Sequence, residues 1–340
     1  MKKYTGTVLS ALANFYWVLL DDRSTYLLCT RRSRLKKSGQ SVLVGDFVVL
    51  QEVDFQCWRG AISQILERRS IIDRPPIANV DQILLIFALA DPFLDPWQLS
   101  RFLIKTESVG IKVHLCLNKS DLISIKESEQ WQERLKNWGY QPILISLNQS
   151  LGLDKLLTAL KDKITVMTGP SGVGKSSLIN TLIPKATQTV AHVSGKLHRG
   201  RHTTRHVELF TIPNGGMVAD TPGFNQANLE FSPIELAYLF PEIRAQLGNC
   251  QFNNCLHRDE PNCSVRGNWE RYAHYLKFLE EVNSQQKIET TETAFKIKMG
   301  AEGTKLYQPK LEFKKYRQNS RRQKNQDLQK LYKQKEDSTD

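Results

Sequence analysis

The stretch that decides the fold is Ile164-Thr165-Val166-Met167, an apolar strand, followed after one residue by Gly169-Pro170-Ser171-Gly172-Val173-Gly174-Lys175-Ser176-Ser177 and a helical pattern. Such a loop binds phosphate groups because its glycines let backbone N–H groups face them, while the start of the helix adds a positive dipole. Lys175 is expected to bridge the β- and γ-phosphates, and Ser176 to bind Mg²⁺. The alternative is a glycine-rich turn without a ligand, which the strand–loop–helix context disfavours. The sequence therefore predicts a phosphate-binding loop.

A second motif, Asn118-Lys119-Ser120-Asp121, points to the base of the nucleotide because it closes the apolar strand at residues 113–117. A carboxylate at Asp121 can accept hydrogen bonds from the N1–H and N2 amino groups of guanine, whereas adenine would leave it unpaired. Asn118 and Lys119 are expected to brace the base and the phosphate loop. Ser146 ends the strand at 142–145 and is expected to lie near guanine O6. These residues favour GTP over ATP.

A third motif, Asp220-Thr221-Pro222-Gly223, follows the apolar residues 217–219. An acidic residue at this strand end fits a water-mediated contact to Mg²⁺, and the Gly223 amide can sense the γ-phosphate. The segment 200–206, between the phosphate loop and Asp220, is the expected switch. Its threonine should close on Mg²⁺, with Thr204 as the first candidate and Thr203 as the second.

Phe224 follows Gly223, where Ras-like enzymes place the glutamine that orients the attacking water. Slow intrinsic hydrolysis is therefore expected. His202 is a candidate substitute for positioning the water, although it can equally be a surface histidine in a basic loop. Lys175, Thr204 and His202 are thus the candidate catalytic residues.

The order of the motifs is unusual, because in most GTPases the Asn-Lys-x-Asp element follows the phosphate loop, and here it precedes it. All the elements are present, so the order predicts a circularly permuted domain, which is tolerable because domain termini often lie close together. The switch that ends at Gly223 runs almost directly into a cysteine- and histidine-rich region. Loss of the γ-phosphate can therefore move that region.

The pattern of apolar, polar and charged residues along the chain predicts four parts. Residues 1–72 hold five short strands, typical of a small β-barrel such as an OB-fold. Residues 77–228 alternate buried strands with helical patterns, which predicts a mainly parallel α/β sheet covered on both faces, and Arg74-Pro75-Pro76 reads as a linker. Residues 229–283 are mainly helical. Residues 284–340 are polar and basic, and we expect a flexible extension able to form helix on binding.

Four metal-ligand candidates are clustered in the third part, namely Cys250, Cys255, His257 and Cys263. Three thiolates and one imidazole fill a tetrahedral Zn²⁺ site and leave no position open for catalysis, so the spacing predicts a structural zinc. Unconnected buried cysteines are the alternative. Cys29, Cys57 and Cys116 are isolated and are expected in the core.

Charge is concentrated at the two ends of the 340-residue chain, whose net charge is +12. Residues 1–70 carry +5 and residues 305–335 carry +9, whereas residues 71–304 supply only +1. Basic flanks favour a polyanionic partner, most simply a nucleic acid, although a solvated tail without a partner is the alternative. The basic loop 31–37 is a candidate RNA contact, and Phe15, Tyr16 and Trp17 can serve either RNA or the core.

The sequence offers no stretch of the length that a membrane-spanning helix needs, and its start lacks the apolar core of a signal peptide. We therefore expect a cytoplasmic protein without a membrane partner.

The joined motifs at 118–121, 169–177, 220–223 and 250–263 resemble the RsgA family, also called YjeQ or EngC, of small ribosomal subunit biogenesis GTPases. The resemblance covers about residues 1–283, and the family's Gly-Arg-His-Thr-Thr switch is matched at 200–204, as is its hydrophobic residue at Phe224. It implies an OB-fold, a circularly permuted GTPase and a zinc domain that together bind the small subunit and its rRNA late in assembly. It also implies hydrolysis of GTP to GDP and phosphate, stimulated by that subunit.

The sequence thus predicts a Mg²⁺-dependent GTP hydrolase that acts as a monomer on the small ribosomal subunit. Two alternatives stay open. One is a GTPase that serves another RNA, such as tRNA or the large subunit. The other is an RNA-binding assembly factor for which GTP is only a structural ligand.

Overall fold

The computed structural model describes residues 2–33, 35, 39–73, 75–183, 207–220, 229, 231–267, 269–299 and 305–309. The chain forms two compact units, Met1–Val282 and Asn283–Asp340. The predicted switch with His202, Thr203 and Thr204 lies outside the described residues, as do Gly223, Phe224 and much of the basic loop 31–37.

The amino-terminal part is a closed five-stranded barrel, which confirms the predicted OB-like architecture. Its strands follow the order β1-β2-β3-β5-β4 and are β1 (Tyr4–Leu12), β2 (Phe15–Leu20), β3 (Tyr26–Arg31), β4 (Phe47–Asp54) and β5 (Arg59–Ile65). Alternate residues point inward, as the period of a strand requires, and the fully buried ones include Val18, Leu27, Val48, Leu50 and Ile62.

The prediction that Cys57 is a core residue is wrong, whereas Cys29 and Cys116 are buried as expected. Cys57 is exposed in the turn between β4 and β5. The carboxylate of Asp54 accepts hydrogen bonds from the backbone N–H groups of Gln56 (2.8 Å) and Cys57 (3.0 Å). Because this Asp-headed turn reverses the chain, the Cys57 side chain lies outside the barrel.

The central part is a six-stranded sheet of order β10-β9-β8-β11-β13-β12. Its strands are β8 (Gln82–Ala88), β9 (Lys112–Asn118), β10 (Ile143–Leu144), β11 (Ile164–Thr168), β12 (Leu209–Thr211) and β13 (Met217–Asp220). The paired strands are parallel except for the antiparallel edge strand β12, so the predicted mainly parallel sheet is confirmed.

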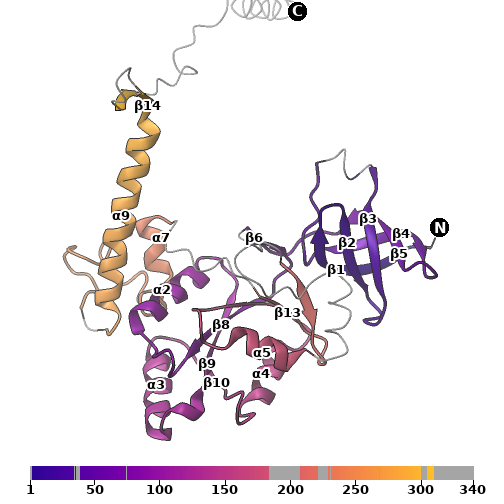
Figure 1. The fold of residues 1–340 in the computed structure, drawn as a ribbon. Helices are drawn as coiled ribbons and strands as arrows, with labels where there is room; N and C mark the ends of the chain where they lie inside the picture. Colours follow the sequence, from indigo (N-terminus) through magenta and orange to yellow (C-terminus); the bar gives the residue numbers. More distant parts are fainter. Residues whose placement is uncertain are drawn as a thin grey trace, which may run out of the picture. The chain divides into compact units, whose positions relative to one another are not determined.

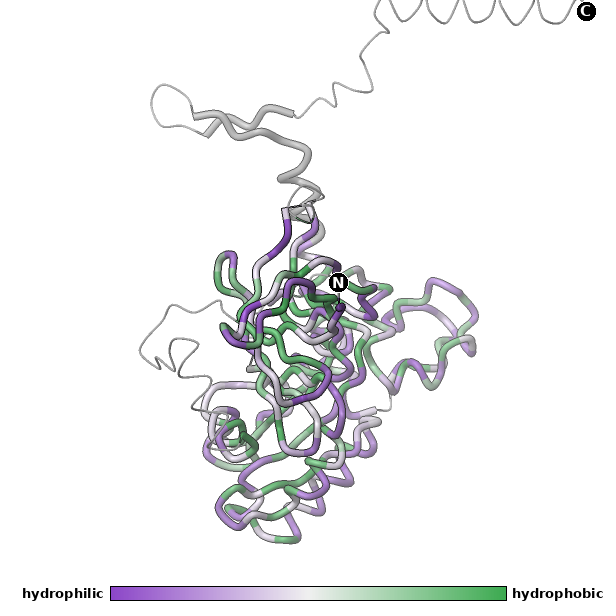
Figure 2. Tube along the Cα trace, turned by 90° about the vertical axis from the view of Figure 1, so that its right-hand side faces the viewer, coloured by the Kyte–Doolittle hydropathy of each residue, from purple (hydrophilic) through white to green (hydrophobic). Residues whose placement is uncertain are grey.

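Helices cover both faces of this sheet because β8 is buried at every position and alternates its side chains between the two faces. Leu84 and Ile86 pack on one face with α4 (Leu153–Leu160) and α5 (Lys175–Leu182). Leu85 and Phe87 pack on the other with α2 (Pro96–Glu107) and α3 (Ile125–Asn137). Figure 1 shows these two helix layers, and Figure 2 shows the hydrophobic stretches of the trace in green.

Two residues of the predicted linker, Pro75 and Pro76, lie at a short hairpin of β6 (Ile71–Asp73) and β7 (Pro76–Ala78), and Arg74 lies outside the described residues. Ile72 and Ile77 are buried between barrel and sheet. The amide of Asn79, itself fully buried, donates to the carbonyl of Gly45 over 2.9 Å. The connection is therefore packed, because Ile72 and Ile77 are part of a hydrophobic core.

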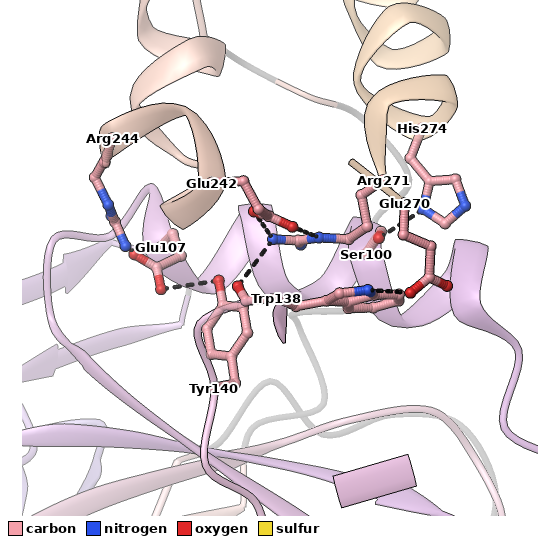
Figure 3. A network of polar contacts seen from close by, with 9 residues as sticks. All are labelled: Ser100, Glu107, Trp138, Tyr140, Glu242, Arg244, Glu270, Arg271 and His274. Atoms are coloured by element: carbon pink, nitrogen blue, oxygen red, sulfur yellow. Dashed lines mark hydrogen bonds and ion pairs between the residues drawn. The ribbon is translucent and has the colours of Figure 1, made fainter. Parts of the chain in front are cut away.

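The cysteine- and histidine-rich part contains α7 (Pro233–Tyr238), α8 (Pro241–Arg244) and the start of α9 (Tyr272–Ala294). Its core includes Phe240, Ile243 and Tyr275, and it takes in Ile104 from α2. The Arg271 side chain is fully buried and forms a two-pronged ion pair with Glu242, with Nε 2.7 Å from Oε1. Its NH2 group also reaches the carbonyl of Trp138 at 3.4 Å, so this contact fastens the region to the end of α3 (Figure 3).

The second unit contains the rest of α9 and a hairpin of β14 (Phe295–Met299) and β15 (Lys305–Pro309). These described residues form a helix and a hairpin, while the flexibility expected of the extension from residue 284 stays a prediction. No glycine or proline stands between Tyr272 and Met299, and glutamine, glutamate and lysine are good helix formers. Residues 295–299 alternate apolar side chains with lysines, which is a strand pattern.

Among the described helices, none is long and apolar enough to cross a membrane.

Candidate nucleotide and metal sites

The carboxyl ends of the parallel strands meet at one edge of the sheet, where open α/β sheets bind their ligands. In register, Ala88 pairs with Asn118, Leu144 with Leu117, and Met167 with Asp220. The base motif after β9, the phosphate loop after β11 and the backbone of Asp220 at the end of β13 therefore lie at the same edge. The permuted order of the motifs does not prevent this assembly.

The phosphate loop needs glycine at two close approaches. Gly169 has φ +147°, and a Cβ there would lie 2.0 Å from the carbonyl oxygen of Ile86. Gly174 has φ +93°, and a Cβ there would lie 2.4 Å from Nδ2 of Asn118. Gly174 is also the N-cap of α5 and offers no side chain to cap it, so the first N–H groups of the helix face the loop.

The Lys175 ammonium group lies over this loop. Its Nζ donates to the carbonyl of Gly169 over 2.8 Å and also to the carbonyl of Pro170. A cation and the uncapped helix start thus converge on one place, which suits an anionic phosphate group.

Asn118 joins the base motif to the phosphate loop. Its Nδ2 donates to the carbonyl of Val173 over 2.9 Å. Its Oδ1 is buried and has no hydrogen-bond partner among the described residues, and the same holds for Oγ1 of Thr168. Leaving a buried polar atom unpaired costs about 1–3 kcal/mol, and both atoms belong to residues that end strands at the candidate site.

Lys119 has a left-handed backbone (φ +60°), and its side chain reaches back to the loop that follows β8. Nζ donates to the carbonyl of Asp91 and lies 3.5 Å from Oδ2 of the same residue. We did not identify Asp91 from the sequence. Its signal was a polar residue directly after the apolar run that ends at Ala90.

Asp121 keeps its carboxyl group ionised. A hydrogen bond from the Ser146 hydroxyl lowers the pKa of Asp121 below the usual 3.8, and the Asn148 amide and the Lys119 charge act in the same direction. The Asn148 Nδ2 lies 3.3 Å from Asp121 Oδ2. Ser146 is fully buried, and its backbone pairs in both directions with Leu151. Asn148 is a second residue that sequence reasoning missed.

The four predicted metal ligands come together, with one ligand atom of each lying within 4.8 Å of all the others. The Sγ atoms of Cys250 and Cys263 are 3.9 Å apart, and Nδ1 of His257 is 3.6 Å and 3.4 Å from them, respectively. A tetrahedral Zn²⁺ with bonds of about 2.3 Å to sulfur has edges of about 3.8 Å. The donor set and its geometry therefore fit one tetrahedral metal ion.

Two tyrosines of α9 support the metal-ligand loop. The Tyr272 hydroxyl donates to the carbonyl of His257 over 2.9 Å, and the Tyr275 hydroxyl donates to that of Leu256 over 2.6 Å. The carboxylate of Glu260 accepts backbone N–H groups on both sides of His257, from Leu256 (2.8 Å) and Arg258 (3.0 Å). These supports were not identified from the sequence, and they bind the backbone of the loop around His257.

Comparison with known proteins agrees with this arrangement. The fold and the nucleotide motifs define a circularly permuted GTPase. The family model described as RsgA GTPase matches residues 65–230. Proteins described as small ribosomal subunit biogenesis GTPase RsgA are 56% identical in Microcystis aeruginosa (95% of this chain, 92% of the relative) and 51% identical in Synechocystis (95% and 94%). The chain therefore belongs to the RsgA GTPase family, which confirms the resemblance inferred from the motifs.

Solved structures show the same architecture. YloQ, described as a circularly permuted GTPase, is 34% identical, with a TM-score of 0.69 over 84% of this chain and 96% of that one. YjeQ from Thermotoga maritima is 28% identical, with a TM-score of 0.68 over 83% of this chain and 99% of that one.

Proposed function

We propose that this protein hydrolyses GTP and thereby assists the late maturation of the small ribosomal subunit. The observation that carries the proposal is the hydrogen bond from Asn118 to the carbonyl of Val173, which joins the base motif with its ionised Asp121 to the phosphate loop. A guanine-specific acceptor and a phosphate cradle are then parts of one rigid site. The names of the relatives support the ribosomal role.

Each predicted site residue has a part in this proposal. Asn118, Lys119, Ser120, Asp121 and Ser146 bind the base, and residues 169–177 bind the phosphates. Lys175 neutralises the charge that develops on the transferred group, as such lysines do. Ser176 and Thr204 would hold Mg²⁺ directly and Asp220 through water, while Gly223 contacts the γ-phosphate. Mg²⁺ bound there would supply positive charge to the phosphate groups, and His202 is the candidate for orienting water.

The Cys–His cluster would hold one Zn²⁺ in a structural role. With four protein ligands around the metal, no coordination position is left for a substrate. The metal would instead fix the loop 250–263 as a rigid surface next to α9.

We further propose the division of labour expected from the sequence. The barrel (1–72) and the zinc region (229–283) bind rRNA around the GTPase part (77–228), and the basic segment from residue 284 adds electrostatic attraction. The protein acts as a monomer in the cytoplasm.

The decisive experiment measures GTP hydrolysis by the full chain with and without isolated small subunits. We expect a clear acceleration by small subunits, a weaker effect of large subunits and loss of activity in Lys175→Ala. If small subunits leave the rate unchanged, GTP is a structural ligand of an assembly factor. If large subunits bind equally well or better with a non-hydrolysable GTP analogue, another RNA is the partner.

A further inference from the structure

The barrel contacts the GTPase sheet at the edge strand β12. Ser10 of β1 forms an isolated antiparallel bridge with Glu208, the residue before β12. On the other side of β12, Leu209 pairs with Ala219 of β13, so Glu208 lies opposite Asp220 when the register is continued. Neighbouring strands are about 4.8 Å apart. Only the backbone of β12 therefore separates the barrel from the strand end that carries Asp220.

β1 can reach β12 because it is irregular at this point. Its pairing with β2 shifts register between Val8 and Ser10. Such a bulge bends a strand and redirects the residue that follows. Ser10 keeps its pairing with Trp17 of β2 beyond the bulge, and the other edge of β1 at this point forms the bridge to Glu208.

The barrel also holds the opposite end of the β12–β13 hairpin, at its turn. The guanidinium NH1 of Arg23 lies 2.7 Å from Oδ1 of Asp162 and donates to the carbonyl of Gly215 over 3.3 Å. Gly215 has φ +83°, and a Cβ there would lie 2.0 Å from the same nitrogen. Arg23 is therefore seated directly against the tight turn of the hairpin.

An apolar layer fills the space between these two polar contacts. Buried barrel residues and buried hairpin residues belong to one hydrophobic cluster, which includes Leu9, Leu19, Val207, Leu209 and Ala219. The Tyr26 hydroxyl of the barrel is also 3.4 Å from Oγ1 of Thr211. Close-packed layers transmit displacement, so the barrel and the hairpin should move together.

The hairpin is joined to the nucleotide site along its other edge. β13 pairs with β11, which leads into Gly169 of the phosphate loop. The segments in which the sequence places the two switches, 200–206 and 220–223, come immediately before and after the hairpin. A change at the γ-phosphate therefore acts on both strands of the hairpin, at the end opposite its turn.

We propose that the β12–β13 hairpin couples the nucleotide state to the barrel, with Arg23 as the positioning residue on the barrel side. This inference rests on the proposed function, because it assigns the γ-phosphate response to the segments around the hairpin. Coupling between two binding events is reciprocal. RNA bound to the barrel then favours one nucleotide state of the GTPase sheet, as each nucleotide state favours one affinity for RNA.

The test measures amide hydrogen exchange in the full chain with GDP or a non-hydrolysable GTP analogue. We expect the exchange of residues 207–220 to differ between the two nucleotides, and the exchange of the barrel around Ser10 and Thr25 to differ as well. Arg23→Ala should keep the first difference and reduce the second by about two- to fivefold, the range that an exposed ion pair can supply. Arg23→Lys should restore most of it.

Glu52→Gln is the control. It removes an exposed ion pair of the barrel, that of Glu52 with Arg32, away from the hairpin, and it leaves every basic side chain in place. The side chains of Arg23 and Asp162 are 57% and 50% exposed, so Arg23→Ala should fold normally.

Nucleotide affinity, measured in parallel, distinguishes a failure of the coupling from a failure of the proposed function. If the chain binds both nucleotides but the barrel shows no difference, or keeps its full difference in Arg23→Ala, the coupling is overturned alone. If the chain binds neither nucleotide, the proposed function fails and the coupling fails with it. With small subunits, the ratio of affinities in the two nucleotide states should fall in Arg23→Ala and stay unchanged in Glu52→Gln.

Discussion

The side-chain amide of Asn118 donates a 2.9 Å hydrogen bond to the backbone carbonyl of Val173, across a sequence separation of 55 residues. In a permuted chain this bond has a particular role, because the base motif comes before the phosphate loop and no short connection keeps them together. This buried hydrogen bond resists separation of the base motif from the phosphate loop, since breaking it leaves a buried acceptor unpaired.

Asn118→Ala should therefore weaken GTP binding by about tenfold or more, because the lost bond is worth about 1–3 kcal/mol and positions the whole loop. Titration with a fluorescent GTP analogue measures the change. Asn148→Ala is the control, because it removes only a 3.3 Å contact to Asp121 at an exposed position. Equal affinity losses in the two variants would show that the hydrogen bond between Asn118 and Val173 has no special role.

Asp121→Asn should lower the affinity for GTP and raise that for xanthosine triphosphate. An amide presents an N–H group to the oxygen at position 2 of xanthine, whereas a carboxylate accepts from the amino group of guanine. Because its pKa lies below 3.8, the contribution of Asp121 is present above that pH and is lost only as the pH falls through the folded-state pKa. Competition binding at neutral pH provides the measurement, and an unchanged preference between the two nucleotides contradicts the assignment.

Local motifs account for most of what the sequence predicted here. Phosphate binding requires glycines, a lysine and a helix start within nine residues, so the chemistry can be identified without knowledge of the fold. Metal ligation likewise leaves a compact pattern, from Cys250 to Cys263. The parallel sheet followed from apolar runs such as β8, whose residues are all buried.

Contacts between distant residues were not predicted, because each depends on the packing of separate elements. Arg271 and Glu242 form a buried ion pair, yet neither stands out in the sequence from the charged residues of solvated helices. The contact of Lys119 with Asp91 and that of Arg23 with Asp162 also join distant segments, at more exposed positions. Charge pairs between distant segments become visible only when the partner is known.

Removal of zinc should unfold the loop 250–263 and leave the nucleotide site intact. Cys255→Ser, which replaces one of the four candidate ligands, should reduce the metal content from one ion per chain toward zero and lower the thermal midpoint. Metal analysis and calorimetry measure both effects, and Cys57→Ser is the matched control because Cys57 is exposed in a turn. Full zinc content in Cys255→Ser would contradict the site.

His274 should make folding stability depend on pH. Burial, helped by the charge of Arg271, lowers the pKa of His274 from 6.5 to about 4, and its Nδ1 lies 2.7 Å from Ser100 Oγ. Glu270, Arg134 and Asp95 also face it, and the two carboxylates oppose the shift. The unfolded chain therefore binds a proton first, so stability is full above pH 6.5 and falls toward pH 4.

The variant His274→Gln should flatten this dependence. Urea unfolding between pH 4.5 and 7 gives the slope for the wild type and the variant. Ser100→Ala keeps the imidazole and should keep the slope at a lower overall stability. The same slope in His274→Gln and the wild type would assign the pH dependence to another group.

A deletion can test the role of the basic tail, and the end of β15 sets where that deletion should begin. β15 ends at Pro309, so a deletion that begins at residue 305 would remove a strand, whereas deletion of residues 310–340 leaves the hairpin whole. The deleted segment holds ten Lys and Arg residues between positions 310 and 335. If they contact rRNA phosphates, each lost contact reduces the salt slope of ribosome binding by about 0.7–0.9. Replacing Lys314, Lys315, Arg321 and Arg322 with glutamine keeps the length and tests charge alone. A slope that is unaltered in both variants assigns the salt dependence to the barrel and leaves the tail without a contact to the subunit.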